Sequence, residues 1–243
     1  MRMRFARRCG AVGVVVAAAL VLGALPASAA PGDGSAYAAN VAVTVLGSAV
    51  DVGPLAPSDT NGPTSAALAS VNVPGVLSAG AVTSHATLDE ATGVVHSDAS
   101  IAGVSLGLSV LTGQIGAVQA TCDATQAGIT GSTTLANVSI PGVTVAANPA
   151  PNTTIAVAPL VSIIFNEQIS NPDGSLTVNA VHIKLNAVAA TGDVILAQAK
   201  CGPAAPPVPL ASGLGLWIGL GLLGLVAVPA GISMIRKRRD AVA

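Results

Sequence analysis

Apolar and polar residues alternate with a period of two through most of the middle of the chain. The pattern is plainest in Val41–Val45 and Leu176–Ile183, where β-branched residues recur at every second position. This period is typical of strands with one buried face. Toward the end of the segment it predicts four strands, at Ile155–Val157, Val161–Ile169, Leu176–Leu185 and Val194–Lys200.

Turn residues separate these runs. Asn171-Pro172-Asp173-Gly174 predicts the turn between the second and third of the four strands, because Pro fixes φ at the first corner and Gly accepts a positive φ. A second hairpin is predicted to join Val82–Leu88 to Val94–Ile101 across Asp89–Gly93.

Two further features mark corners and loops. Val71–Val76 (VNVPGV) is echoed by Val138–Val143 (VSIPGV), which predicts two similar corners, and Pro54–Pro63 predicts a loop. Many short strands with turns between them indicate an all-β fold, a single antiparallel β-sandwich or barrel-like domain over residues 30–201.

Two apolar stretches of different character bracket this domain. The first follows several arginines, runs from Val12 to Leu25 and ends in Ala27-Ser28-Ala29, so residues 1–29 are predicted to be a secretory signal peptide that is removed. The second, residues 213–235, has no charged residue and is long enough for a transmembrane helix.

The flanks of the second stretch orient it. A proline-rich stalk, residues 202–212, precedes the helix, and Trp217 suits its outer interface. The basic tail, residues 236–243, is expected to be cytoplasmic and the domain outside. The cationic anchor residues of this tail are Arg236, Lys237, Arg238 and Arg239. Because short motifs, apolar runs and arginines also make sorting signals, cleavage of the tail and transfer to the cell wall stay open.

Negative charge lies mainly in the predicted domain, whereas positive charge lies mainly in the predicted targeting segments. Of eleven carboxylates only Asp240 lies outside the predicted domain, whereas of ten lysines and arginines only Lys184 and Lys200 lie within it. The domain is therefore acidic, which argues against nucleic acid as a partner.

Two cysteines, Cys122 and Cys201, remain after removal of the predicted signal peptide. An oxidising exterior favours a disulfide between them, which would tie the last strand of the domain to its middle. A redox or metal pair is the alternative, but the sequence offers neither CxxC spacing nor a nearby histidine.

Candidate chemistry is sparse. His85 and His96 are expected to face each other across the predicted hairpin beside Asp89 or Asp98, and two histidines with a carboxylate can bind zinc. The wet face of a sheet produces the same pattern, so no metal, cofactor or catalytic residue is predicted.

The densest polar cluster is Asn166-Glu167-Gln168. It is interpreted as a strand end turning toward Asn171, with ligand or cation binding as the alternative.

One resemblance covers most of the predicted domain. The chain from Thr121-Cys122-Asp123 through Gly131–Asn137, Asn166–Gln168 and Asp173–His182 to Cys201 resembles the choice-of-anchor P family of actinobacterial surface proteins. The resemblance implies an extracellular domain with a cysteine near each end of its second half, and it supplies no catalytic residues. An LPxTG motif, one anchor type, is missing before the apolar segment.

These features predict a membrane-anchored extracellular β-domain, not an enzyme, with a structural, adhesive or interaction role at the bacterial envelope. Its expected partners are the membrane, envelope proteins or a second copy of itself. The alternative is a surface enzyme or a ligand- or metal-binding module whose site the sequence hides.

Overall fold

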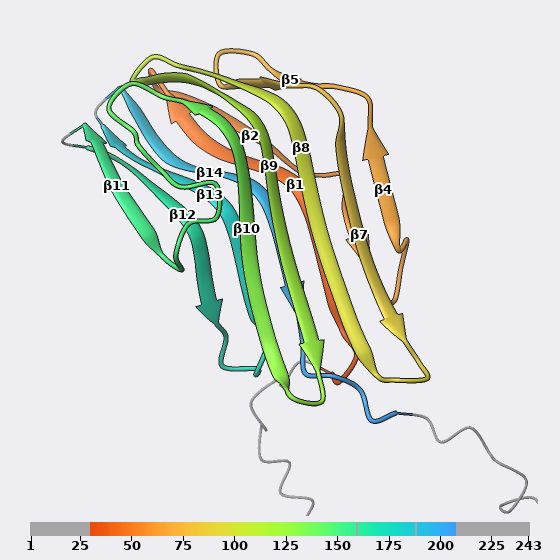
Figure 1. Ribbon diagram of the computed structural model, residues 1–243. Coiled ribbons are helices and arrows are strands. Elements are labelled where there is room, and N and C mark those ends of the chain that lie inside the picture. The colour runs from red at the N-terminus through yellow and green to blue at the C-terminus, as the bar shows by residue number, and fades with distance from the viewer. Residues whose placement is uncertain (1–29, 159, 188, 208–243) are drawn as a thin grey trace, which may run out of the picture.

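The computed structural model describes residues 30–158, 160–187 and 189–207, and within them the chain folds into two antiparallel β-sheets (Figure 1). The predicted signal peptide, transmembrane helix and basic tail lie outside the described residues, as does the end of the predicted stalk. In the described part of the chain, no helix is long and apolar enough to cross a membrane.

The first sheet, sheet A, contains the last strands of the domain together with its first ones. Its order is β11–β12–β13–β14–β1–β2, and β3 pairs with the beginning of β1. The strands are β11 Thr153–Ala158, β12 Val161–Ser170, β13 Leu176–Ala187, β14 Ala190–Cys201, β1 Gly34–Val45, β2 Ser48–Leu55 and β3 Ser58–Asp59.

The second sheet, sheet B, contains the middle of the chain. Its long central strand β8 pairs with β9 along one side, and along the other with β7 in its first half and β6 in its second. The strands are β4 Ser65–Leu68, β5 Val71–Val73, β6 Leu77–Ala79, β7 Val82–Asp89, β8 Val94–Leu108, β9 Leu111–Thr125 and β10 Gly128–Ser139.

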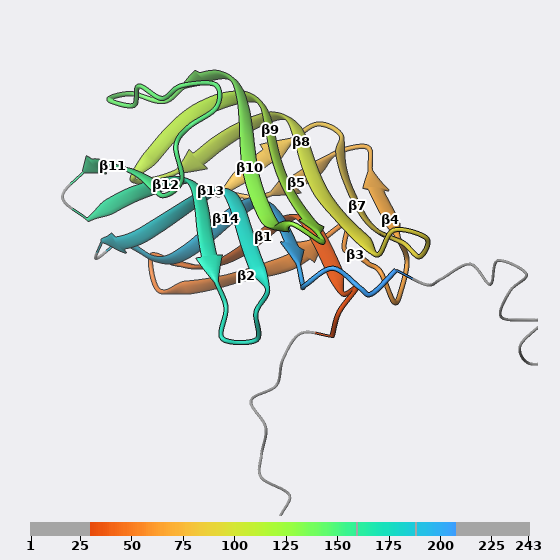
Figure 2. The same cartoon turned by 60° about the horizontal axis from the view of Figure 1, so that its bottom comes forward.

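The two sheets face each other and enclose a single core (Figure 2). Inward positions alternate with outward ones along each strand, so Ile163 and Val194 of sheet A share the buried layer with residues such as Ile101 and Val118 of sheet B. Phe165 is fully buried there. The fold is a β-sandwich, the first of the two predicted architectures.

Most predicted strands and turns are confirmed. The hairpin of β7 and β8 turns at Asp89–Gly93, and the four strands predicted after Pro149 are β11 to β14 with slightly extended ends. Both Pro-Gly corners are also confirmed, with Gly75 and Gly142 at positive φ. The predicted loop Pro54–Pro63 is partly wrong, because Pro54 and Leu55 belong to β2 and Ser58–Asp59 pairs with β1 as β3.

The sandwich has two distinct ends. Both limits of the described chain lie at one end, the terminal end, made of residues 30–33, the turns at 89–93, 125–128 and 171–174, and residues 202–207 (Figure 1). The opposite end, the far end, is made of the turns at 46–47, 74–75, 109–110 and 141–142 with Leu160 and Ala189.

The inward-outward alternation of sheet A reverses along one row of residues. Each of four adjacent strands has at least two consecutive buried residues there, including Phe165–Asn166, Ala180–Val181, Leu196–Ala197 and Ala38–Ala39. The backbone is left-handed at Asn166 (φ 51) and Ala197 (φ 54). We call this row, Asn166, Ala180, Ala197 and Ala38, the crease, because it separates the half of the sheet near the terminal end from the half near the far end.

Candidate functional site

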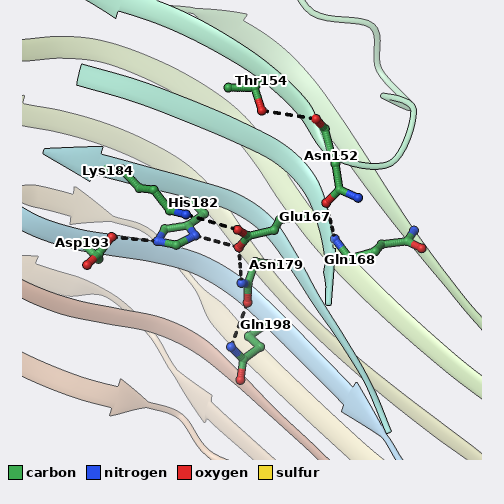
Figure 3. A network of polar contacts seen from close by, with 9 residues as sticks. All are labelled: Asn152, Thr154, Glu167, Gln168, Asn179, His182, Lys184, Asp193 and Gln198. Carbon is green, nitrogen blue, oxygen red and sulfur yellow. Dashed lines mark hydrogen bonds and ion pairs between the residues drawn. The ribbon is translucent and has the colours of Figure 1, made fainter. Parts of the chain in front are cut away.

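A buried polar network lies beside the crease on the outer face of sheet A (Figure 3). The outward direction follows from the neighbouring residues. Gln168 faces sheet B, since its Nε2 donates to the carbonyl of Gly131 at 2.8 Å, and Glu167 beside it points the other way. His182 lies between the core residues Val181 and Ile183 and points outward for the same reason.

Glu167 is the centre of this network. Its Oε2 accepts hydrogen bonds from Asn179 Nδ2 at 2.7 Å and from His182 Nδ1 at 2.6 Å, and its Oε1 is 3.6 Å from Lys184 Nζ. Exposure is only 7% for Glu167, 2% for Asn179 and 9% for His182. A carboxylate this buried requires such partners.

The network continues across two more strands. His182 Nε2 is 3.0 Å from Asp193 Oδ1 in β14, and Gln198 Nε2 donates to Asn179 Oδ1 at 2.8 Å. Glu167, Asn179 and Gln198 lie on the terminal side of the crease, whereas His182 and Asp193 lie on its far side. The hydrogen bonds therefore connect the two halves of the sheet.

Opposing effects act on the charge of Glu167. Burial favours the neutral acid, but the hydrogen bonds from Asn179 and His182, with the charges of His182 and Lys184, outweigh it and hold the pKa of Glu167 below its usual value. The carboxylate form of Glu167 is thus the form that the network binds. Beyond the network, Tyr37 of β1 lies opposite Gln198 in the pairing of β1 with β14, and burial raises the pKa of Tyr37 to about 12.

The chemistry of this arrangement is mainly structural. The carboxylates of Glu167 and Asp193 contact both ring nitrogens of His182. With both nitrogens engaged, the ring has no site left to take a proton from a nucleophile. The network binds strands β12, β13 and β14 together at the crease.

The interpretation of Asn166-Glu167-Gln168 as a strand end is wrong. All three residues lie within β12, which continues to Ser170, and Asn166 is buried with its Nδ2 donating to the carbonyl of Pro149. The polar cluster marks the crease, because Asn tolerates the left-handed backbone that reverses the strand's faces. His182 and Asp193, which complete the network, could not be linked to it without the strand register.

The histidines of sheet B are arranged differently from the prediction. His85 pairs in register with Asp98 and His96 with Thr87, so the two rings are not directly opposite. Instead His96 Nδ1 is 2.6 Å from Asp123 Oδ1 on β9, and His96 Nε2 is 3.3 Å from Asp98 Oδ1. The hydrogen bond to Asp123 raises the pKa of His96, although burial partly opposes the shift.

Metal ligands are not assembled in the part of the chain that the structure describes. There, no group of three or more His, Cys, Asp or Glu side chains is placed to hold an ion. Asp89 instead binds its own turn, with Oδ1 accepting from the Ala91 N–H and Oδ2 from the Thr92 hydroxyl.

The terminal end is fastened by several bonds. Cys122 of β9 and Cys201 of β14 form a disulfide between the two sheets, with a Cα–Cα distance of 5.8 Å. Beyond Cys201, the Gly202 N–H donates to the carbonyl of Asp33 and the Ala205 N–H to that of Gly93. Residues 202–205, the beginning of the predicted stalk, therefore lie against the domain.

A surface cavity of about 230 Å³ opens beside the hydrogen bond between Gly202 and Asp33. Asp33, Asp59 and Asp173 line it together with Lys200, whose Nζ is 3.4 Å from Asp173 Oδ2. Hydrogen bonds from Asn61 occupy oxygens of Asp33 and Asp59, and Ser175 donates to Asp173. These carboxylates thus accept hydrogen bonds that stabilise the surrounding loops.

Comparison with family models, curated proteins and solved structures finds no match to this chain. The resemblance to the choice-of-anchor P family therefore stays a prediction. The anchor residues Trp217 and Arg236–Arg239 lie outside the described residues.

Proposed function

We propose that this protein is a membrane-anchored, non-enzymatic β-domain with a structural, adhesive or interaction role outside the bacterial cell. The observation that carries the proposal is the difference between the two ends of the sandwich. The chain leaves toward the predicted anchor at the terminal end, which is fixed by the disulfide and by residues 202–205.

The far end supports a contact role because it is apolar where turns are usually polar. Its turns hold no charged residue among those described, and Leu46 and Leu160 are exposed by 78% and 48%. An anchor at the opposite end would direct this surface away from the membrane, toward the wall or another cell.

The test is the intact mass of the native protein from membrane and wall fractions, measured with and without reduction and alkylation. A mass running from Ala30 to Ala243, with Cys122 and Cys201 alkylated only after reduction, is expected. A mass ending before Gly213 would contradict the retained anchor and identify the tail as a sorting signal.

A second candidate function rests on the network around Glu167. A surface ligand with a cationic group would compete with His182 and Lys184 for the carboxylates of Glu167 and Asp193, as a ligand-binding module requires. Saturable binding of an envelope component that is lost in Glu167→Gln and kept in Glu90→Gln would favour this candidate.

A further inference from the structure

The edges of the two sheets are not equally protected against pairing with another strand. Three features interrupt the β2 edge: the exposed Asp51, Pro54, and the register shift opposite Ala39–Val41. β4 and β5 are short, and the Leu135 N–H of β10 already donates to the carbonyl of Ala147. The remaining edge is β11, at the left border of Figure 1.

Within the described residues, the backbone of β11 directs hydrogen-bonding groups away from β12 in a regular pattern. The Asn152 N–H donates to the carbonyl of Asn166 at 2.8 Å, and alternation then directs Thr154 and Ala156 toward β12. Thr153 and Ile155 direct their N–H and C=O groups away from β12. Val157, the extra residue of a bulge, has no partner in the register.

The side chains suit pairing as well. The chain has no charged residue from Ala124 to Asn166, and β11 contains no proline. Thr153 and Ile155, whose backbone groups point away from β12, and the bulge residue Val157 are all β-branched, the class that packs best between neighbouring strands. Within β11 itself neither a charge nor a proline discourages a second strand, and the flanking Pro151 and Pro159 limit the pairing to this segment.

We propose that β11 is the pairing edge of a homotypic dimer, in which β11 of a second copy adds antiparallel about a two-fold axis at Ile155. This register places Thr153 opposite Val157 of the second copy and Ile155 opposite its equivalent, so each of these three residues meets a β-branched residue. The same symmetry brings the exposed Leu160 opposite the exposed Ala150.

Charge favours a second copy on this edge over one on other surfaces. The domain has ten carboxylates against Lys184 and Lys200, so two copies repel each other wherever acidic surfaces meet. Pairing through β11 keeps the acidic terminal ends apart.

The geometry has a consequence for adhesion, which rests on the proposed anchoring. Antiparallel pairing reverses the strands of the second copy, so the two terminal ends point in opposite directions. Anchored copies that pair in this way join two apposed membranes.

The first experiment tests symmetry. In the full chain, Ile155→Cys adds one unpaired cysteine to the exported domain, and oxidation is expected to give a disulfide-linked dimer that reduction returns to monomer. Ala49→Cys on the protected β2 edge is the control and is expected to stay monomeric. A crosslink to a different protein, or none, would overturn the homotypic pairing.

The second experiment tests the edge without changing a core contact. The full chain, reconstituted in neutral phosphatidylcholine vesicles, is expected to cluster them, and Ala156→Lys should lower the clustering by about tenfold or more, because like charges meet across the two-fold axis. Ala49→Lys, an exposed alanine on β2, should cluster vesicles normally. Equal clustering by both variants would refute the proposal.

Two controls separate the causes of failure. Protection of Cys122 and Cys201 from alkylation reports that each variant is folded. If the tail proves to be cleaved, the anchoring fails, yet the released Ile155→Cys protein still crosslinks; an anchored protein that does not crosslink shows that the pairing alone is wrong.

Discussion

The terminal end and the far end of the sandwich are built from opposite kinds of turn. At the terminal end Asp89 and Asp173 accept hydrogen bonds from their own turns, and a disulfide joins the sheets. At the far end Leu46 adopts a left-handed backbone (φ 49) while 78% of it is exposed. A left-handed leucine in water is unfavourable twice, in conformation and in hydration.

From this difference we infer that local stability is highest where the chain leaves the domain. Polar turns with satisfied side chains stabilise the terminal end, whereas the far end retains exposed apolar residues that a partner would cover. Such unfavourable positions are typical of contact surfaces.

The largest expected effect comes from removing the bond that distinguishes the terminal end. The Cys122→Ala, Cys201→Ala double variant opens a loop with a sequence separation of 79. It should lower the free energy of unfolding by about 4 kcal/mol in the chain-entropy model. Urea denaturation measures the loss, and an unchanged midpoint would show that this bond contributes little.

The second largest loss in the free energy of unfolding is expected from disrupting the network across the crease. Glu167→Gln removes the charge that His182 and Asn179 bind, and it should lower the free energy of unfolding by about 2 kcal/mol. Because the pKa of Glu167 is lowered on folding, its contribution is present above the unfolded pKa and is lost as pH falls through the folded one. The exposed Glu90→Gln is the matched control; equal effects would mean that the crease does not depend on this carboxylate.

Substitutions in the turns of the two ends should change the free energy of unfolding in opposite directions. Leu46→Asn at the far end should raise the free energy of unfolding by about 0.5–1 kcal/mol, since Asn tolerates the left-handed backbone. Asp173→Ala at the terminal end should lower it by about 1 kcal/mol, because the Ser175 N–H and hydroxyl lose their acceptor. Thermal unfolding of the two variants measures both effects. Midpoints that shift in the same direction would contradict the proposed difference between the two ends.

The smallest effect concerns His96, whose ring is partly exposed. Folding raises its pKa, so its contribution is fully present below the unfolded pKa of about 6.5 and is lost as pH rises through the folded value. Solvent screening limits it to a few tenths of a kcal/mol. Asp123→Asn should flatten this part of the pH profile of stability, and a profile identical to that of the unchanged protein would exclude the ion pair.

The sequence allowed the strands near Pro172 and Asp89 to be placed, because alternation and turn residues act locally. It also indicated the disulfide, since only two cysteines remain after the predicted export. The crease could not be predicted: it depends on left-handed backbones at Asn166 in β12 and Ala197 in β14, the two strands that flank β13, and an alanine gives no signal of that. The contact of His96 with Asp123 was missed because it requires the pairing of β8 with β9.

The position of the disulfide has a mechanical meaning. A pull on the chain beyond Cys201 reaches β14 in sheet A and, through the covalent bond, β9 in sheet B at the same time. Strands β10 to β14 lie inside the loop that this bond closes, so the load cannot peel them off and draw them out one by one from the C-terminal side. Of the described domain, only the chain before Cys122 is free to lengthen under tension.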